Sequence, residues 1–501
     1  MKTKLLKLLT LISCTATLVS CGGEPDYPVV KTEVDYTETS VDFVGTPKSN
    51  RILMDYSDSY FKTKANVEVM PLEFARISLG LALVAHPSTS SITTVTPNHV
   101  KYFFQGMGYE NVIANSSFNV SSNDEDSVGL CFGYKKIGDY NTIAVGIKGF
   151  MYKQEWAGNF KVGTSEECVD HLGFYNAAKK AESEIRNYIQ SLSLPNNAKL
   201  RLWTSGYSRG GGISTLLGRI LDDERDEGTL GLNLVVEDQY SFAYDAPVTS
   251  GKENKDSYNN IHTFNNKDDI VTRVMPSQYG FHNVGRIHYI NDFVTHDKFV
   301  ENLGYYAFNA KEQHFTPYHV EIDSESEEMF VFTEITGSTK TVSDYYNDLL
   351  TILLTEKPED TTAIDISTRD NYANNIQFAL TDVIKFAFNL SSLELLALYN
   401  QVKDYTKDDL MEIATKVLFN DKDGIKSKLT EILNGAKVKY SEENLDKIVE
   451  QVLGVAATFI GAIGTSSDVQ GYIDSVGTIA KNYEYVIQQH LSQVNLCYFI
   501  E

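Results

Sequence analysis

The chain has 501 residues, of which 42% are hydrophobic and 11% aromatic, a composition that supplies a packed core and excludes a disordered protein. Its formal net charge of -23 at pH 7 excludes nucleic acid as an expected partner, because an acidic surface repels the phosphate backbone. Beyond the N-terminal segment the chain has only Cys131, Cys168 and Cys497, and three scattered cysteines make neither a disulfide framework nor a metal cluster.

Residues 1–20 have the features of an export signal. Three lysines precede an apolar stretch that is too short to span a bilayer, and small residues follow it. Residues 18–21, Leu-Val-Ser-Cys, resemble the bacterial lipobox, which implies that Cys21 becomes the lipidated first residue of the mature protein. Loss of the three lysines would change the net charge from -23 to -26.

These features predict an exported cell-envelope lipoprotein that is held on a membrane surface by the lipid on Cys21. An ordinary secretory signal, cut elsewhere, is the alternative. The sequence after the cysteine begins GGEPDYP, and residues 21–45 are predicted to form a flexible tether.

Residues 46–340 are predicted to form the core, and up to about residue 290 they alternate between short β-rich runs and amphipathic helical runs. The predicted strands are RILMDY (51–56), SVGLCFGY (127–134), NTIAVGIKG (141–149), KLRLWTSG (199–206), LVVEDQYSFAYD (234–245), NIHTF (260–264) and VGRIHYI (284–290). The predicted helices are PLEFARISLGLALVA (71–85), GFYNAAKKAESEIRNYIQSL (173–192) and RGGGISTLLGRILDD (209–223). Such alternation predicts the α/β class, with a mostly parallel central sheet.

Residues 341–480 have a different character, because their apolar residues recur at helical spacing almost throughout. Thr406 and Ser441 are each placed to cap the start of a helix. An apolar run at 452–463 is too short to span a membrane. This helical region is predicted to be either a lid near a binding site or a small bundle with a buried helix.

Ser208 lies in a G-x-S-x-G pattern with Gly206 and Gly210, between a predicted strand and a predicted helix. In this pattern the serine occupies a sharp strand-to-helix turn and acts as a nucleophile. Glycine and serine are also common in loops, so the pattern alone is a weak signal.

Four ordered motifs, one of which contains this serine, follow one another along the chain. They are KGFMYKQEWAGNF (148–160), VDHLGF (169–174), SGYSRGGG (205–212) and FNNKDDIVTRVMPSQYGF (264–281), with YSFAYDAPV (240–248) as the strand before the last one. Together they resemble the fungal-type (class three) lipases, and in particular a bacterial lipoprotein branch of that family. The resemblance covers roughly residues 51–290. It implies an α/β-hydrolase fold, with the helical region as an insertion or a C-terminal helical subdomain, and no metal or organic cofactor.

The resemblance also assigns roles to particular residues. Asp269 matches the acid of a Ser-His-Asp triad, and its neighbour Asp268 is interpreted as a solvated loop carboxylate. The backbone N–H groups of Phe150 and Arg209 match the oxyanion hole. Two residues depart from the family pattern: Phe150 stands where serine or threonine is usual, and Tyr207 stands where histidine is usual.

The general base should follow Asp269, because the triad order in this fold is Ser, Asp, His. The candidates are His282, His288, His296, His314, His319 and His490. His490 is favoured, because family members also end soon after their histidine, and His319 in FTPYHVEI is the main alternative. His490 as the base makes residues 341–480 an insertion and residues 481–501 the final segment of the core. His319 would make the helical region a C-terminal appendage.

The sequence thus predicts a membrane-anchored serine hydrolase that cleaves carboxylic esters, of acylglycerols or phospholipids, through an acyl-enzyme. Its predicted partners are the ester or lipid substrate and a membrane surface, and not nucleic acid. Two alternatives stay open: a non-catalytic surface lipoprotein that keeps the lipase fold to bind lipid or a partner, and a hydrolase of soluble esters or thioesters. The sequence specifies neither acyl length nor oligomeric state.

Overall fold

In the computed structural model, most of the described residues belong to one α/β unit. The described residues are 27–37, 49–85, 96–118, 126–149, 158–159, 161, 168–273, 275, 280–295, 298–299, 301–302, 394, 397–398, 401, 412–413, 416, 421–451, 453, 490 and 492–499.

The centre of this unit is a seven-stranded sheet in which the strands follow one another in chain order, β3 to β9. The first two pairs, β3 with β4 and β4 with β5, are antiparallel, and the strands from β5 to β9 are parallel. The strands are β3 (Glu110–Ala114), β4 (Leu130–Ile137), β5 (Tyr140–Ile147), β6 (Lys199–Tyr207), β7 (Gln239–Tyr244), β8 (Ile261–Asn265) and β9 (Arg286–Tyr289). The predicted α/β class with a mostly parallel sheet is therefore confirmed.

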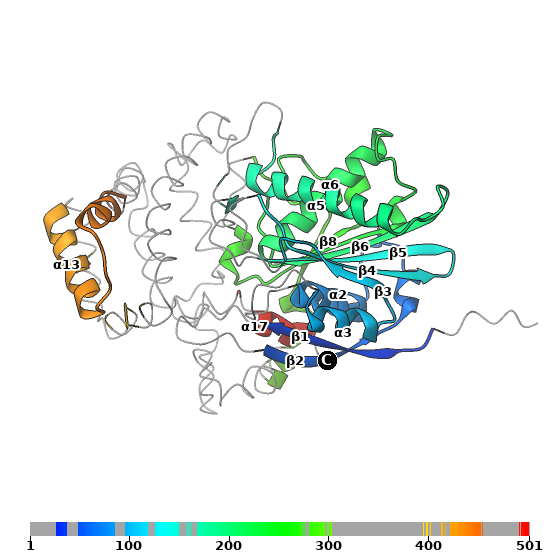
Figure 1. Cartoon of the computed structure of the whole chain (residues 1–501), viewed down its shortest axis with the longest axis horizontal. Helices are drawn as coiled ribbons and strands as arrows, with labels where there is room; N and C mark the ends of the chain where they lie inside the picture. Colours follow the sequence, from blue (N-terminus) through cyan, green and yellow to red (C-terminus); the bar gives the residue numbers. More distant parts are fainter. Residues whose placement is uncertain are drawn as a thin grey trace, which may run out of the picture.

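Helices cover both faces of the sheet, as Figure 1 shows. One face carries α2 (Leu72–Val84) and α3 (Asn98–Gly106), and the other carries α5 (Leu172–Ser191) and α6 (Arg209–Asp226). Short 3-10 turns connect these elements, at Asp58–Lys62, Val236–Asp238, Asp256–Tyr258, Ile270–Arg273 and Ile290–Asp292. The sheet is thus the middle layer of three.

Strand β5 illustrates why both faces are covered. Its side chains alternate between the faces, so Ile143 and Val145 pack in the cluster under α5 and α6, while Ala144 belongs to the cluster under α2. A strand that is apolar on both faces is typical of a buried parallel sheet. The central strand β6 follows the same rule: Leu202 packs in the cluster under α5 and α6, and Trp203 packs in the cluster under α2.

A second, two-stranded antiparallel sheet lies beside α2 and α3 and consists of β1 (Val30–Thr37) and β2 (Ser49–Tyr56). The predicted strand at 51–56 lies within β2. Strand β1 falls inside the segment 21–45 that was expected to be a tether, and its Val34 is buried in the main core. This part of the segment is a strand because its alternating sequence, VKTEVDYT, pairs with β2 along its whole length.

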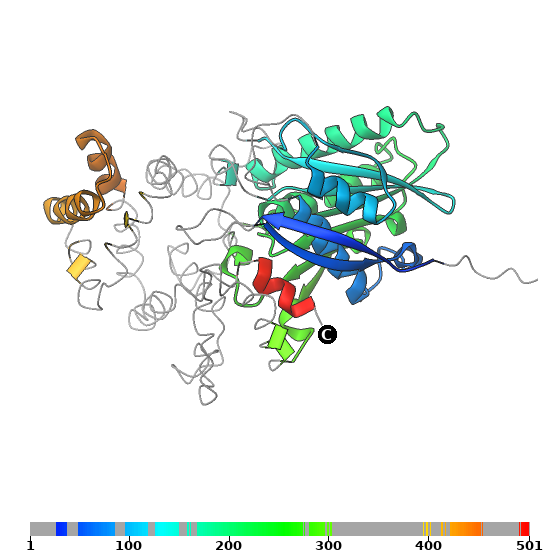
Figure 2. The same ribbon diagram turned by 60° about the horizontal axis from the view of Figure 1, so that its bottom comes forward.

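The C-terminal segment also packs against the sheet-bearing unit, although it lies far from the sheet in sequence (Figure 2). It consists of α17 (Ser492–Leu496) and a 3-10 turn, Cys497–Phe499. The ring of Tyr498 stacks on Phe299 with centroids 4.1 Å apart, and Phe499 contacts Tyr244 edge-on. Asn302 donates a hydrogen bond to the Cys497 carbonyl oxygen over 2.9 Å.

The predicted helical region 341–480 is described only in small part. It contains α13 (Lys422–Gly435), whose N-terminus is capped by the Asp421 carboxylate, which accepts a hydrogen bond from the Gly424 N–H. Residues of α13 and of the segment up to residue 453 share a small apolar cluster. Within the described parts of the chain, no helix combines the length and the apolar character that a membrane span requires. The role of this region as an insertion stays a prediction.

A buried ionic cluster connects α6 with the segment that leads into α5. Arg219, which is 2% exposed, binds the carboxylates of Asp170 and Asp223, the second over 2.6 Å. Asp170 also accepts the Gly251 N–H over 2.9 Å, so the cluster extends to the loop after β7. Because these charges are shielded from water, each depends on its partners for stabilisation.

We expect Arg219→Leu to lower the free energy of unfolding by about 3 to 5 kcal/mol, because it leaves the Asp170 carboxylate buried without its cation. Chemical denaturation measures this loss. The double variant with Asp170→Asn should lose less than the sum of the two single variants. Lys31→Leu is the control: its pair with Asp55 is largely exposed and should contribute less. Equal losses for Arg219 and Lys31 would show that burial does not set the cost of removing the cation.

Candidate active site

Ser208 lies on the sharp turn between β6 and α6. Its backbone has φ 55° and ψ -123°, a conformation that residues with a side chain rarely adopt. The turn is fixed from both sides, because the Ser208 N–H donates to the Tyr244 carbonyl oxygen over 2.8 Å and the Gly212 N–H donates to the Ser208 carbonyl oxygen over 3.0 Å. The strained serine therefore stands at the carboxyl end of the central strand.

The two glycines of the G-x-S-x-G pattern are required by close contacts between backbones. A Cβ atom on Gly206 would lie 2.1 Å from the Gly210 carbonyl oxygen, and one on Gly210 would lie 2.4 Å from the Ile147 carbonyl oxygen. Side chains at either position would push α6 away from the ends of β5 and β6. The sequence pattern thus marks a real strand-to-helix turn.

His490 lies between Ser208 and Asp269. Its Nε2 atom is 2.8 Å from the Ser208 hydroxyl oxygen, and its Nδ1 atom is 2.6 Å from Oδ2 of Asp269. The Asp269 side chain is fully buried, whereas that of His490 is 22% exposed. An imidazole held in this way can accept the serine proton while the carboxylate stabilises its charged form.

Asp269 follows β8, at the same edge of the sheet as Ser208. Its Oδ1 accepts the Val271 N–H over 2.8 Å, which leaves Oδ2 directed at His490. The Thr272 hydroxyl donates to the Asp269 carbonyl oxygen over 2.8 Å and closes the turn. The expectation that Asp268 is solvated was wrong: it is only 9% exposed, and its N–H donates to the Asn266 side chain.

The pKa of His490 reflects two opposed effects. Burial lowers it, but the negative charge of Asp269 and the hydrogen bond to that carboxylate outweigh burial, so the pKa is raised above its ordinary value of 6.5. The buried Asp245 carboxyl group would act in the same direction if it were ionised. The site therefore favours a proton on the imidazole.

Of the two residues expected to form an oxyanion hole, the structure describes Arg209 but not Phe150. Arg209 is the first residue of α6, so its N–H lies at the positive end of the helix dipole. Phe150 lies outside the described residues, as does Cys21. The motif that contains Phe150 (148–160) contacts the motif at 169–174. The ring of His171 lies 3.1 Å from the Asn159 carbonyl oxygen, and Gly173 lies against the backbone of Gly158.

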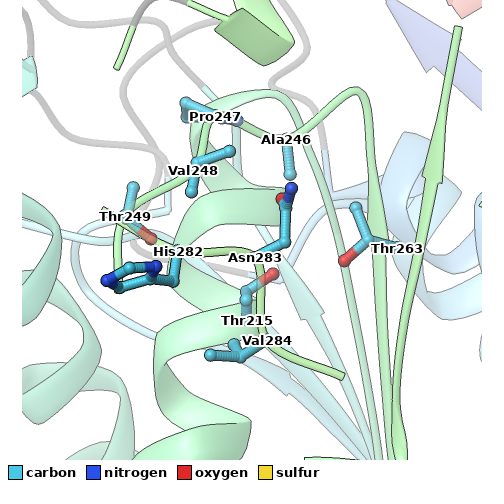
Figure 3. A pocket seen from close by; sticks show the side chains of 9 residues that line it. All are labelled: Thr215, Ala246, Pro247, Val248, Thr249, Thr263, His282, Asn283 and Val284. Carbon is cyan, nitrogen blue, oxygen red and sulfur yellow. The ribbon is translucent and has the colours of Figure 1, made fainter. Parts of the chain in front are cut away.

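The structure places two other candidate bases in different surroundings. His288 stacks on His262, with ring nitrogens 3.0 Å apart, and burial lowers the pKa of His288 to about 4. His282 lines a small pocket together with side chains such as Thr215 and Thr249 (Figure 3). The pocket volume of about 10 Å³ suits about one water molecule.

The remaining candidate bases, His296, His314 and His319, lie outside the described residues.

Three residues that surround His490 were not predicted from the sequence. The carboxyl group of Asp245 lies close to both His490 and Asp269: one oxygen of each carboxyl group and one ring nitrogen of His490 all lie within 4.8 Å of one another. The Tyr207 hydroxyl and the Asn495 side chain contact Asp245. The departure from the family pattern at Tyr207 was the one sequence signal that pointed to this network.

Comparison with known proteins gives one family match. Residues 144–279 match the model of the family described as lipase (class 3). This segment includes Ser208 and Asp269 and ends before His490. The match supports a lipase-like ester hydrolase and implies the α/β-hydrolase fold.

Comparison with curated proteins finds no match. Among solved structures, the chain is similar to a Rhizomucor miehei lipase in its native propeptide complex, at 17% identity and a TM-score of 0.25. The similarity covers 33% of this chain and 54% of that one, so the chain spans about half the length of the fungal enzyme.

We expect Asp269→Asn to lower the pKa of His490, because the imidazolium loses the carboxylate that stabilises it. NMR titration of the histidine ring resonances measures both values, and in the unaltered protein His490 should titrate above 6.5. Asp292→Asn, which removes an exposed carboxylate paired with Lys267, should leave the titration unchanged. An unaltered pKa in Asp269→Asn would refute the electrostatic coupling.

Proposed function

We propose that the protein is a serine ester hydrolase in which Ser208 is the nucleophile, His490 the general base and Asp269 the acid. The observation that carries the proposal is the continuous chain of hydrogen bonds from the Ser208 hydroxyl through the His490 imidazole to the buried Asp269 carboxylate. The class 3 lipase match over residues 144–279 supports the same chemistry.

In the first half of the reaction, the Ser208 oxygen attacks the carbonyl carbon of the ester while its proton passes to Nε2 of His490. The negative charge that develops on the carbonyl oxygen is stabilised by the backbone N–H of Arg209 and, by resemblance to the family, that of Phe150. His490 then gives its proton to the departing alcohol, and an acyl group stays on Ser208.

In the second half, water attacks the acyl carbon while one of its protons passes to His490, and His490 then returns that proton to the Ser208 oxygen as the carboxylic acid leaves. The base must be neutral to begin either half. Because the pKa of His490 is raised, activity should fall as the pH drops through a value above 6.5.

The proposed substrates are acylglycerols or phospholipids, in keeping with the family match. The proposed location is the cell envelope, where a lipid on Cys21 would hold the enzyme at a membrane surface. In the proposed layout, strand β1 and residues 46–340 and 481–501 form the hydrolase core, and residues 341–480 are an insertion. Support for this layout comes from the packing of residues 492–499 against the sheet-bearing unit.

We expect Ser208→Ala to abolish ester hydrolysis and covalent labelling by a fluorophosphonate, because no other group replaces the attacking hydroxyl. Hydrolysis is measured with a panel of glycerol esters, phospholipids, soluble esters and thioesters, which also identifies the preferred class. Ser191→Ala, at an exposed serine at the end of α5, should behave like the unaltered protein.

If the unaltered protein neither hydrolyses an ester nor reacts with the fluorophosphonate, the enzyme proposal is wrong. A lipase-fold protein that binds lipid without cleaving it would then account for the fold. Full activity in Ser208→Ala would exclude Ser208 as the nucleophile.

We expect Cys21→Ala to lose its lipid and to move from the membrane fraction to the soluble or unprocessed fraction, because a lipid chain is the proposed anchor. Fractionation followed by mass spectrometry of the N-terminus measures this change. Cys14→Ala, at the other cysteine of the N-terminal segment, is the control and should stay with the membrane. Unchanged membrane binding of Cys21→Ala would point to a different anchor.

A further inference from the structure

A second buried carboxyl group lies beside the Asp269–His490 pair. Asp245 directly follows β7, is 1% exposed and has a positive φ of 43°. One of its carboxyl oxygens lies within 4.8 Å of a carboxyl oxygen of Asp269 and of a ring nitrogen of His490. Neither half of the proposed reaction uses Asp245, so its burial at this point calls for another explanation.

The two oxygens of Asp245 have different neighbours. Oδ1 accepts the Asn266 N–H over 2.8 Å. Oδ2 lies 3.2 Å from the Tyr207 hydroxyl oxygen and also contacts Nδ2 of Asn495. Asp245 therefore connects β7, β6 and the C-terminal segment that carries His490.

Tyr207 makes the direct connection to His490. Its hydroxyl oxygen lies 2.7 Å from the main-chain carbonyl oxygen of His490 and 2.9 Å from Nδ2 of Asn495. The two rings are also close, with centroids 5.5 Å apart. Tyr207 thus holds the backbone of the residue whose ring lies between Ser208 and Asp269.

The number of protons on Tyr207, Asn495 and Asp245 determines which group donates in each contact. The His490 carbonyl oxygen can only accept, and it lies nearer to the Tyr207 oxygen than Asp245 Oδ2 does, at 2.7 against 3.2 Å, so the single Tyr207 proton is assigned to it. Asn495 supplies its amide protons to Tyr207 and Asp245. The remaining contact, between the Tyr207 and Asp245 oxygens, is a hydrogen bond only if Asp245 carries a proton.

We propose that Asp245 is a positioning residue that acts as a neutral carboxylic acid: it donates to the Tyr207 hydroxyl, so that Tyr207 keeps its proton on the His490 carbonyl oxygen. The inference rests on the proposed function of His490, and it extends that function by naming what fixes the base.

The electrostatics agree with a neutral Asp245. Burial raises the pKa of Asp245 well above its ordinary value, and the charge of Asp269 raises it further, while His490, the Asn266 N–H and the contact with the Tyr207 hydroxyl lower it by less. Two phenols, Tyr207 and Tyr498, also face this carboxyl group, and burial raises the pKa of each. Two carboxyl groups this close do not both ionise readily, and Asp269 has the imidazole as its partner.

Ionisation of Asp245 would weaken the hold on His490. A carboxylate would attract the Tyr207 proton away from the His490 carbonyl oxygen, and the imidazole would lose part of its alignment. Because small displacements of reacting groups reduce rates strongly, activity should fall as the pH rises through the pKa of Asp245.

The first test is infrared spectroscopy of the full chain at pH 7. The difference between the unaltered protein and Asp245→Asn should contain the carbonyl band of a protonated carboxylic acid, and the band should disappear as the pH rises. A difference spectrum with only carboxylate bands would overturn the proposal. This test does not depend on hydrolysis, so it can fail or succeed separately from the proposed function.

The second test uses activity. Tyr207→Phe, which removes the connection to His490, should lower kcat on the order of 100-fold with little change in KM, and it should shift the Nδ1 proton resonance of His490. Asp245→Asn keeps a neutral donor, so it should retain most activity and lose the decline at alkaline pH. Asp222→Asn, at a buried carboxyl group of α6 bound to Arg225, should keep that decline.

Thermal unfolding of each variant separates a loss of positioning from a loss of fold. Unchanged kcat and an unchanged His490 resonance in folded Tyr207→Phe would overturn the proposal, as would an alkaline decline that persists in Asp245→Asn.

Discussion

The position of the His490 imidazole is the contact on which the arrangement of the site depends. It joins a serine at the end of β6 to a carboxylate after β8, and 282 residues separate it from the serine in sequence. Closing so long a separation is unfavourable in entropy, so other contacts must hold the segment in place. They are the buried rings of Tyr498 and Phe499 and the hydrogen bond from Asn302 to Cys497. Residues 492–499 are therefore part of the core that carries the site.

The serine side of the site depends on close backbone packing. The positive φ of Ser208 is unfavourable, and it persists because glycines at 206 and 210 allow α6 to approach β5 and β6. The same approach brings the positive end of α6 to the edge of the sheet where β7 and β8 end. A parallel sheet directs all these strand ends to one edge, and that edge is where Ser208, Asp245 and Asp269 meet.

The departure at Tyr207 has a physical consequence in this chain. A tyrosine hydroxyl reaches the His490 carbonyl oxygen, the Asn495 amide and the Asp245 carboxyl group at once. Such a buried network is stabilising only if each polar atom has a partner of the right kind, which is why the protonation of Asp245 matters. The residue that departs from the expected pattern thus lies at the centre of the network around His490.

Local sequence patterns predicted much of the core, because alternation along strands and the spacing of apolar residues along helices reflect burial directly. The runs at 199–206 and 209–223 correspond to β6 and α6, and the G-x-S-x-G spacing indicated the turn between them. Strand β1 was missed because it lies in a segment whose composition suggested a tether. Its pairing with β2, which makes it a strand, is seen only in the tertiary structure. Helix α3 and strand β3 were missed as well.

The sequence by itself determined the α/β class, because strand alternation and helical spacing reflect burial. It pointed to Ser208 and Asp269 through the resemblance of their motifs to class three lipases, and it favoured His490 among six histidines. Only the tertiary structure decided that the His490 ring lies between Ser208 and Asp269, and that Asp245 and Tyr207 surround it. These contacts join segments that are distant along the chain, and no local pattern encodes which side chains meet when a sheet edge and a chain terminus pack together.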